Sequence, residues 1–512
     1  MQRSETPGPQ LDAHRNDYTY YILMPKCDKE TVMPEVVKLQ QNQQVNAEIE
    51  NMQRIFQAQK SAHLKNMLPT VKQRKTWLKT LKKTLLNHID DIVKSIHADF
   101  EQRSAYETKI LEIVPSVESI KYTIKHLKNW MRPQRKRVSI WFKPAKALLM
   151  PQPLGVVGII VPWNYPIYLA LGPLISALSA GNRVMIKMSE STPKTGETLA
   201  NIIGECFAED LVAVINGDVK VSEQFTQLPF DHILFTGSAA IGRKVMRQAS
   251  ENLTPVTLEL GGKSPAIIGP EPNAEKYIQR LFMGKFFNAG QTCVAPDYVL
   301  LPKDKKQMFI EKAKYYYRRY YPKHKQYGDR TTLINQRHYQ RLQSYLAQAK
   351  QQNAKLIELD ESQSLSHERH LNPQLIFNLE SSSKLLQEEI FGNLLPVVTY
   401  DTLNEVLTYI NSKPRPLALY YFGHDKNNIK RVVENTIAGG VAINDTILQI
   451  SQDVLPFGGV GDSGMGHYHG YEGFKTFSKL KPIFIQSRIS SFEFLYPPYN
   501  RFTDFILKLM LR

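Results

Sequence analysis

The feature that most constrains this chain is a regular alternation of short apolar runs and helical stretches that begins after Pro153. The runs have the length of strands and lie at residues 156–161, 184–187, 212–216 and 233–236. Such runs separated by helical segments are typical of parallel sheets with crossover helices. A second block with the same alternation extends from about residue 261 to 444 and includes strand-like runs at 298–301 and 440–444. We therefore predict the α/β fold class, with two parallel-sheet, Rossmann-like domains.

The segments outside these two blocks differ in texture. Residues 1–46 are polar and rich in Pro, Gln and Asn, so we expect a loosely ordered N-terminal extension. Residues 49–130 follow a helical pattern, in which apolar side chains recur at three- and four-residue spacing. A basic boundary follows this helical segment and leads into a strand-like run at residues 138–142. We find no internal repeat and no long low-complexity tract.

Composition and charge narrow the class of protein. The chain has 512 residues, of which 42% are hydrophobic, and this suffices for two packed domains with a large core. Its cysteines, Cys27, Cys206 and Cys293, show no CxxC spacing, and the N-terminus has no apolar signal-peptide core, so we expect a cytoplasmic setting. The net charge of +17 could serve nucleic acid, an anionic membrane or an acidic ligand. A solvated basic surface is the simpler interpretation, and we predict no nucleic-acid partner.

Two apolar stretches bear on membrane contact. No charged residue lies between Lys146 and Arg183, but five prolines in this interval exclude one continuous spanning helix, so we predict a buried strand, turn and helix. Residues 491–512 form an amphipathic tail whose last twelve residues are too few to span a bilayer. Peripheral membrane contact, a partner subunit or the body of the protein itself could cover its apolar face. That face carries Phe502, Phe505, Ile506, Leu509 and Met510.

Three polar side chains occupy positions suited to chemistry. Cys293 ends the hexapeptide NAGQTC, although a cysteine by itself is more often a small buried hydrophobe than a nucleophile. Glu259 lies in a strand-like run before a Gly-Gly turn. It could be exposed or paired with a lysine, but burial in a cleft would raise its pKa and make it a general base. Asn164 follows a predicted strand and lies between two prolines. It could simply form a turn, or its side-chain amide could donate a hydrogen bond to an oxyanion.

Other segments suggest a nucleotide and exclude a metal. The sequence FTGSAAIG at residues 235–242 predicts a strand, a glycine turn and a helix, which would direct backbone N–H groups at phosphate. Its glycine spacing is not GxGxxG, so the generic dinucleotide signal is weak. Lys187 and Glu190 follow another strand and could bind ribose hydroxyls or form surface ion pairs. His467 and His469 have no third ligand at a recognised spacing, so we predict no metal site.

Taken together and in order, these motifs resemble the aldehyde dehydrogenase superfamily. The resemblance rests on the Pro-Trp-Asn turn, FTGS, ELGGKSP, GQTC, EEIFG and LPFGGVG, with Cys293 34 positions after Glu259 as in the family. Residues 464–478 are similar to the class 3, fatty-aldehyde-type branch, and residues 131–133, 182–190 and 228–232 are similar to its coniferyl aldehyde dehydrogenase group. Met188 and Asn393 depart from the pattern, because many members have proline at these positions. Both changes alter the stiffness of loops beside the cofactor.

The resemblance implies oxidation of an aldehyde to the acid with NAD(P)+. Cys293 would attack the aldehyde, Asn164 would hold the oxyanion, and Glu259 would activate the water that hydrolyses the thioester. Glu190 would disfavour a 2′-phosphate by charge repulsion, so NAD is expected, with NADP possible. The residues implied to bind the cofactor are Trp163, Lys187, Glu190, Gly217, Gly237, Ser238, Leu260, Glu389 and Phe391.

The same resemblance implies a domain division and partners. An NAD(P)-binding domain would comprise residues 47–130 and 150–260, and a catalytic domain residues 261–477. A small β oligomerisation arm at 131–149 and 478–490 would make a homodimer, with contacts near 138–142 and 482–486. The expected substrate is a coniferyl-type aromatic aldehyde. A medium- or long-chain aliphatic aldehyde is the alternative.

Other functions fit the residues less well. In a CoA-acylating dehydrogenase CoA would take the acyl group, so Glu259 would be superfluous as a base for water. A cysteine hydrolase has no use for the ribose and phosphate motifs. The charge of +17 permits a binding protein that keeps an inactive enzyme fold, but the intact set of Cys293, Glu259 and Asn164 argues against it.

Overall fold

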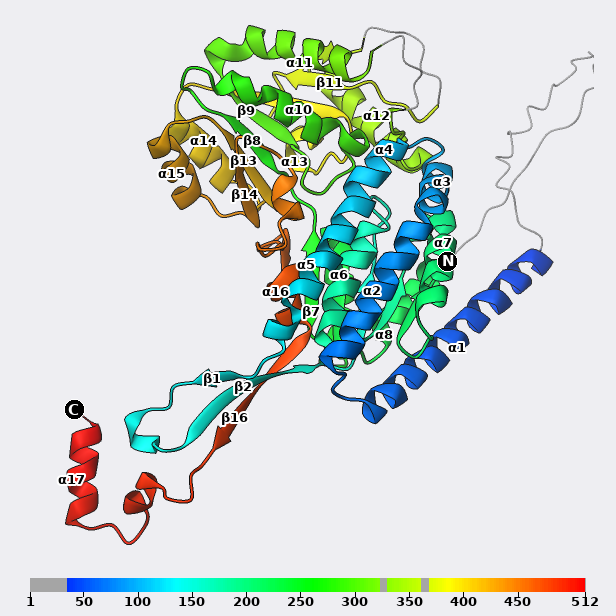
Figure 1. Ribbon diagram of the computed structural model, residues 1–512. Coiled ribbons are helices and arrows are strands. Elements are labelled where there is room, and N and C mark those ends of the chain that lie inside the picture. The colour runs from blue at the N-terminus through cyan, green and yellow to red at the C-terminus, as the bar shows by residue number, and fades with distance from the viewer. Residues whose placement is uncertain (1–34, 323–328, 361–367, 512) are drawn as a thin grey trace, which may run out of the picture. The chain divides into compact units, whose positions relative to one another are not determined.

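The structure is a computed structural model that describes residues 35–322, 329–360 and 368–511 (Figure 1). Residues 1–44 and 45–512 form separate units by contact. The first helix, α1 (Glu35–Lys65), begins within the segment that we expected to be loosely ordered. Residues 35–46 lack Pro and Gly and are rich in good helix formers, which accounts for the difference. The rest of the expected extension, residues 1–34, lies outside the described residues.

The second unit contains a six-stranded sheet with the strand order β15-β7-β6-β3-β4-β5. All strands are parallel except β15, which pairs antiparallel with β7. The runs predicted as strands after Pro153 are therefore confirmed. The strands are β3 (Val156–Ile160), β4 (Arg183–Lys187), β5 (Val212–Ile215), β6 (His232–Gly237), β7 (Val256–Leu260) and β15 (Gly464–Met465).

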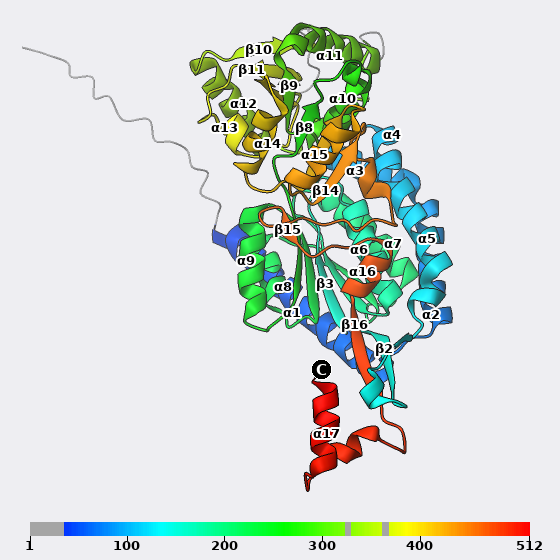
Figure 2. The same cartoon turned by 90° about the vertical axis from the view of Figure 1, so that its left-hand side faces the viewer.

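Helices cover both faces of this sheet (Figure 2). Successive strand residues point to opposite faces, so Val157 and Ile159 pack on one side while Val156 packs on the other. The first face is covered by α2 (Val71–Asn87), α3 (Ile89–Phe100), α5 (Val114–Trp130), α6 (Tyr168–Ala180) and α7 (Pro193–Cys206). The second is covered by the part of α1 from Val45 onward, α8 (Val219–Gln227) and α9 (Ala239–Ser250).

A seven-stranded sheet has the order β10-β11-β12-β9-β8-β13-β14, and only the pair β10-β11 is antiparallel. Its strands are β8 (Pro265–Ile268), β9 (Tyr298–Pro302), β10 (Lys355–Glu358), β11 (Gln374–Phe377), β12 (Leu394–Tyr400), β13 (Ala418–Phe422) and β14 (Gly440–Ile443). The helices packed with it are α10 (Ile278–Phe286), α11 (Lys306–Tyr320), α12 (Gln336–Gln351), α13 (Lys384–Gln387), α14 (Leu403–Asn411) and α15 (Lys426–Asn435). The α/β fold class with two mainly parallel sheets is confirmed.

The segment near the C-terminal end of the predicted catalytic domain belongs with the first sheet. Although residues 261–477 were assigned to one domain, β15 pairs with β7, and α16 (Gly470–Thr476) packs against α5 and α6. Phe474 lies in the same hydrophobic core as the first sheet. The chain therefore returns to the first sheet before residue 477, because Phe474 and the edge of β7 find their packing partners there.

A third, antiparallel sheet consists of β1 (Gln134–Lys136), β2 (Lys146–Pro153) and β16 (Ser478–Ile485). The strand predicted at residues 138–142 is wrong. Ile140–Phe142 form a 3-10 turn in the connection between β1 and β2, where Pro144 offers no N–H for a ladder. The interval between Lys146 and Arg183 contains β2, β3, the Asn164 turn and α6, as predicted.

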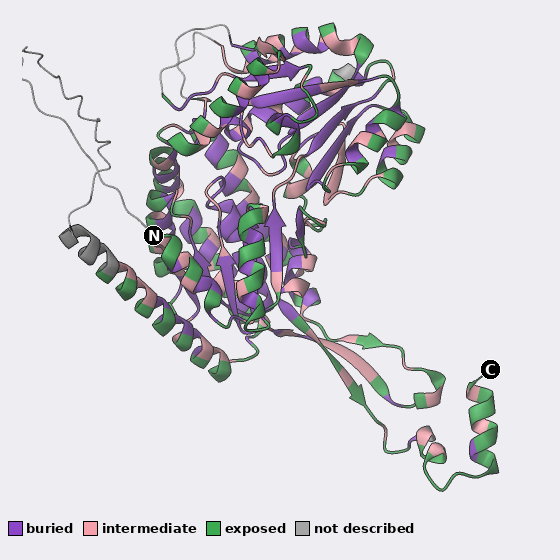
Figure 3. Cartoon of the chain, turned by 180° about the vertical axis from the view of Figure 1, so that it is seen from behind, coloured by how far each residue is buried: buried purple, intermediate pink, exposed green. Residues whose placement is uncertain are grey.

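The chain ends in a helix, α17 (Arg501–Met510), which is largely exposed in Figure 3. Phe502 and Phe505 on its predicted apolar face are 51% and 61% exposed. No helix in the described ranges has the length and apolar character needed to cross a bilayer.

Candidate active site

Cys293 lies on the loop between α10 and β9. This loop is folded tightly, because Asn288 and Ala289 adopt left-handed backbone conformations with φ of 53° and 54°. A side chain on Gly290 would place its Cβ 2.4 Å from the carbonyl oxygen of Gly392, so only glycine fits there. The thiol is partly buried at the end of this loop.

Asn164 lies on the loop between β3 and α6 and contacts the cysteine loop directly. Its side-chain Nδ2 donates a hydrogen bond to the carbonyl oxygen of Gln291 at 3.2 Å. The hydroxyls of Tyr165 and Thr292 share a second hydrogen bond, of 2.6 Å. An amide nitrogen carries two hydrogens, so one bond to Gln291 fixes the amide plane and leaves the other hydrogen for a ligand.

Glu259 is the penultimate residue of β7 and is only 2% exposed. Neither of its carboxylate oxygens has a hydrogen-bond partner among the described residues. Burial raises the pKa of this carboxyl group well above its ordinary value, since the charged form loses its hydration. A buried carboxyl group with raised pKa and unused hydrogen-bonding capacity has the properties of a general base.

One cavity of about 260 Å³ brings most of the predicted site residues together. It joins the carboxyl end of the first sheet to the cysteine loop, and three potential catalytic groups line it although they come from different elements. The predicted residues at its wall are Trp163, Asn164, Gly237, Ser238, Glu259, Leu260, Cys293, Glu389 and Phe391. Their assigned roles remain predictions.

Two residues at the cavity wall, Arg341 and His338, lie outside all the motifs identified in the sequence. Arg341 of α12 donates hydrogen bonds to the carbonyl oxygens of Glu389 and Ile390, at 3.1 and 2.6 Å, and so holds the segment before Phe391. The ring of His338, one turn earlier, lies 4.9 Å from Trp163. Burial lowers the pKa of His338 to about 4, so its ring is neutral at neutral pH. Neither residue belongs to a recognisable motif, and only the position of α12 brings them to the cavity.

Glu389 and Phe391 form one side of the cavity. The Glu389 carboxyl group is buried, which raises its pKa to about 8, and its Oε1 has no partner within the described part of the chain. The Phe391 ring lies edge-on to Trp163 with 5.4 Å between ring centres.

Met188 and Asn393, the two residues that depart from the family pattern, both fit the structure. Met188 is buried, and the side chain of Asn393 donates a hydrogen bond to the Leu371 carbonyl oxygen.

Three predicted cofactor residues lie outside this cavity. The Nζ of Lys187 donates hydrogen bonds to the carbonyl oxygens of Met188 and Gly217 at 2.7 and 2.8 Å, and burial lowers its pKa to about 8. Gly217 has a φ of 121°, which few other residues adopt. Glu190 is exposed nearby, and its charge acts on Lys187.

The two histidines of the HxH pair face different partners. His467 pairs with Glu472 at 3.2 Å near the surface. His469 is buried, and its Nε2 lies 3.3 Å from the Tyr168 hydroxyl.

The fold and the cavity define the class of an α/β enzyme with two mainly parallel sheets and a cysteine near the carboxyl end of one of them. The model of the aldehyde dehydrogenase family matches residues 25–483, and the chain belongs to this family. Members of this family oxidise aldehydes to acids with NAD(P)+, and the predicted enzyme class is confirmed.

Named relatives cover almost the whole chain. A probable coniferyl aldehyde dehydrogenase of Pseudomonas aeruginosa is 48% identical over 94% of this chain and 100% of its own length. Aldehyde dehydrogenase family 3 member A2 of Macaca fascicularis is 36% identical over 88% of this chain and 92% of its own. The solved structure of the substrate-bound state of Staphylococcus aureus AldH, 37% identical, covers 90% of this chain and 99% of its own with a TM-score of 0.85. The expected family and class 3 branch are therefore confirmed.

Proposed function

We propose that this enzyme oxidises a coniferyl-type aromatic aldehyde to the carboxylic acid with NAD+. The observation that carries the mechanism is the single cavity in which Cys293, Asn164 and Glu259 converge. The substrate class is supported by the name of the 48% identical relative.

The residues present fit a dinucleotide. Glu389 Oε1 and Thr236 Oγ1 are buried at the cavity without hydrogen-bond partners among the described residues, and ribose hydroxyls or a carboxamide would satisfy such atoms. Ser238 is the N-cap of α9, whose N-terminus favours a phosphate. When bound, NAD+ supplies the acceptor for a hydride. Gly237 and Ser238 would hold its pyrophosphate, and Glu389 and Phe391 would hold the nicotinamide ribose and ring against Trp163 and Leu260.

The adenosine end would be held by the second group of residues. Lys187 and Glu190 would bind the ribose hydroxyls beside Gly217. A 2′-phosphate there would meet the carboxylate of Glu190, and like charges repel by about 1 kcal/mol at 4 Å even in water. NAD+ is therefore the proposed cofactor in preference to NADP+.

The chain's own groups account for each chemical step. The Cys293 thiol releases its proton to solvent and its sulfur adds to the aldehyde carbon, which gives a hemithioacetal whose oxyanion accepts hydrogen bonds from the free Asn164 amide hydrogen and the Cys293 N–H. Loss of hydride from the same carbon leaves a thioester on the sulfur. Glu259 then takes a proton from water as the water attacks this thioester, and the acid leaves with the Cys293 thiol restored.

The finer statements about partners are also proposals. A homodimer through the three-stranded sheet is supported by exposed apolar side chains on it and its connection, since Ile140, Phe484 and Ile485 are 71%, 55% and 46% exposed. Peripheral contact of α17 with an anionic membrane is supported by its exposed phenylalanines beside Arg501 and Lys508. Molecular mass by light scattering tests the first, and co-sedimentation with anionic vesicles the second. We propose a cytoplasmic location.

One assay tests the proposed function. Purified protein is mixed with NAD+ and an aldehyde in the absence of CoA, and reduced-nicotinamide absorbance is followed. We expect turnover, with a higher kcat/KM for coniferyl-type than for alkyl aldehydes. A flat trace across the whole panel discards the proposal, and a preference for alkyl aldehydes discards the substrate class. Cys293→Ala serves as the control that abolishes turnover and leaves NAD+ binding intact.

A further inference from the structure

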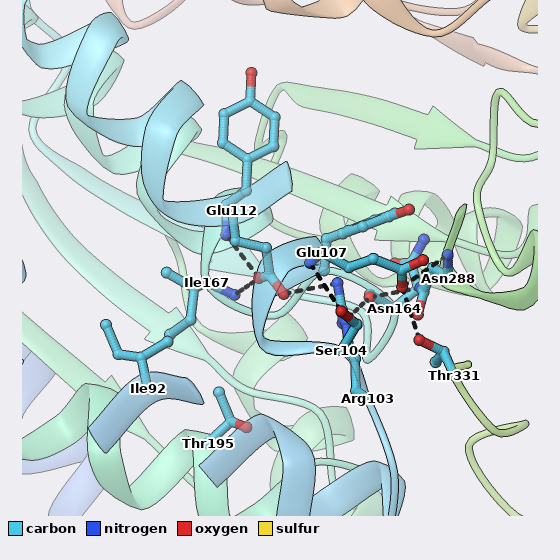
Figure 4. Close-up of polar contacts among 12 residues, drawn as sticks. Ile92, Arg103, Ser104, Glu107, Glu112, Asn164, Ile167, Thr195, Asn288 and Thr331 are labelled. Carbon is cyan, nitrogen blue, oxygen red and sulfur yellow. Dashed lines mark hydrogen bonds and ion pairs between the residues drawn. The ribbon is translucent and has the colours of Figure 1, made fainter. Parts of the chain in front are cut away.

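Three buried charged side chains lie behind the wall of the cavity rather than in it. Arg103, Glu107 and Glu112 are 2%, 6% and 0% exposed, and none of them belongs to a family motif noted above. They come from the segment after α3, which contains α4 (Ala105–Thr108) and a π-helical turn (Lys109–Ile113). Figure 4 shows Arg103 beside Asn164, Glu107 beside Asn288 and Glu112 beside Ile167. Burial of ionisable groups costs free energy of desolvation, which only ion pairs and hydrogen bonds to the groups can offset.

Arg103 contacts the oxyanion loop directly. Its Nη1 donates a hydrogen bond to the main-chain carbonyl oxygen of Asn164 at 2.9 Å. Its Nη2 forms an ion pair of 3.0 Å with Oε1 of Glu112, and both side chains are fully buried. The guanidinium group also lies 5.0 Å from the ring centre of Tyr165. Arg103 therefore contacts both the Asn164 carbonyl oxygen and the aromatic ring of the next residue in this loop.

Glu112 holds the other end of the same loop. Its Oε2 accepts hydrogen bonds from the N–H groups of Ile167 and Tyr168, at 2.7 and 3.2 Å, where α6 begins. A carboxylate at a helix N-terminus satisfies N–H groups that have no partner within the helix. The ion pair of Arg103 and Glu112 therefore spans the loop from Asn164 to the first residues of α6.

Glu107 contacts the cysteine loop in the same way. Its Oε2 accepts hydrogen bonds from the main-chain N–H of Asn288 at 3.2 Å and from the Thr331 hydroxyl at 2.7 Å. The Asn288 side chain then donates to the carbonyl oxygens of Asn164 and Gln291, at 3.0 and 3.1 Å. Asn288 is one of the residues in the left-handed conformation, so Glu107 supports the strained part of this loop.

We propose that Arg103, Glu107 and Glu112 are positioning residues that set the Asn164 amide against the Cys293 sulfur. The carbonyl oxygen of Asn164 accepts from both Arg103 and Asn288, while its amide donates to Gln291, so the backbone and the side chain are fixed together. The two loops follow strands and helices of different sheets, and this network connects them. The inference rests on the proposed role of Asn164 as the oxyanion donor. The π-helical turn that carries Glu112 is a feature that is frequently found at functional sites.

The test compares Glu107→Ala with Glu107→Gln. The alanine variant leaves the Asn288 N–H without its acceptor, whereas the glutamine oxygen still accepts from it. We expect Glu107→Ala to lower kcat by roughly ten- to a hundredfold, because small misplacements of reacting groups have effects of that size. The KM for NAD+ should stay unchanged, and Glu107→Gln should recover most of the lost rate. The exposed Glu118, which pairs with Lys121, provides the matched control Glu118→Ala.

A double-mutant cycle separates positioning from a general loss of structure. If Glu107 acts through Asn164, then Glu107→Ala should have little further effect on kcat in an Asn164→Ala background. Alkylation of Cys293 by iodoacetamide needs no oxyanion donor, so its rate should be the same in Glu107→Ala and in the parent enzyme. Equal multiplicative losses of kcat in both backgrounds, or a parallel loss of alkylation, would overturn the proposal.

Arg103→Lys provides a second variant if Glu107→Ala does not fold. It keeps the charge opposite Glu112 but cannot reach both partners, so kcat should fall with the same dependence on Asn164. An unchanged kcat in Arg103→Lys would also overturn the proposal. Failure of the proposed function itself is recognised separately, because the parent enzyme would then show no turnover, or Cys293→Ala would keep it.

Discussion

Gly261 leaves no space for a side chain, because a Cβ atom there would lie 2.0 Å from Oε2 of Glu389. The Glu389 carboxyl group thus occupies the volume next to the backbone just beyond β7. Glu389 lies two residues after the C-terminal end of α13, and Arg341 donates a hydrogen bond to its main-chain carbonyl oxygen. Gly261 is therefore required because the Glu389 carboxylate approaches its backbone closely, and not because of a left-handed backbone conformation.

Gly261→Ala should displace the Glu389 carboxyl group without unfolding the protein, since the atom in conflict is the end of a flexible side chain. We expect the KM for NAD+ to rise about tenfold, which is the effect of losing roughly 1.4 kcal/mol of binding. Steady-state kinetics at saturating aldehyde measure this change. An unaltered KM for NAD+ would exclude Glu389 as a cofactor contact.

Gly204→Ala is the matched control for that substitution. Gly204 lies within α7 and is exposed, and no atom lies within 4 Å of the place that a Cβ atom would take there. Because alanine is the better helix former, the variant should unfold at a slightly higher temperature, with up to about 1 kcal/mol of added stability. Its KM for NAD+ should equal that of the parent enzyme.

Glu259→Gln should slow hydrolysis of the thioester, because the amide cannot take a proton from the attacking water. We expect a burst of reduced nicotinamide in the first turnover, followed by a steady-state rate that is lower by about a hundredfold or more. Rapid-mixing absorbance and mass spectrometry of the acylated Cys293 peptide measure the two phases. A variant with no burst and an unchanged steady state would show that Glu259 is not the base.

Glu190→Gln should relax the preference for NAD+ over NADP+. Removing one carboxylate charge near the ribose removes a repulsion of about 1 kcal/mol, so kcat/KM for NADP+ should rise about fivefold. The exposed Glu197 of α7 gives the control Glu197→Gln, which should leave the ratio unchanged. Equal ratios in Glu190→Gln and the parent enzyme would remove Glu190 from the ribose site.

The Cys293 thiol should react slowly with iodoacetamide in the free enzyme. Burial raises its pKa to about 12, with further contributions from the Glu389 and Glu259 carboxylates. A raised pKa favours the neutral thiol, so the reactive thiolate should grow about tenfold per pH unit from pH 7 to 10 without a plateau. Peptide mapping of Cys293 distinguishes its labelling from that of the other cysteines.

The same reaction shows whether the carboxylates act on the thiol. The Glu389 carboxyl group has a pKa raised to about 8, so it is charged above that pH and opposes formation of the thiolate. Glu389→Gln should therefore speed alkylation at pH 9 and have less effect at pH 7. If the rate of Cys293 alkylation in the parent enzyme reached a plateau below pH 8, the raised pKa of the thiol would be contradicted.

Much of the fold could be predicted because it depends on local patterns. The runs at residues 156–161 and 298–301 are strands β3 and β9, and the spacing of Leu78, Leu81 and Leu85 defines the buried face of α2. The strand predicted at residues 138–142 was wrong. β-branched and aromatic residues favour a strand, but here the strands that pair are β1, β2 and β16, and Ile140–Phe142 form a 3-10 turn in the connection between β1 and β2. The helix over residues 35–46 was missed for another reason, because its polar composition resembles that of a loosely ordered extension.

The sequence by itself determined the alternating elements, the motif residues Cys293, Glu259 and Asn164, and hence the family, because residue type and spacing along one segment carry that information. Only the tertiary structure decided that Arg341 and His338 reach the cavity, that Gly261 makes room for Glu389, and that Arg103 and Glu107 connect the two loops. These relations join segments far apart in the chain. Their energies depend on distance and burial, which are defined only when both sheets are packed.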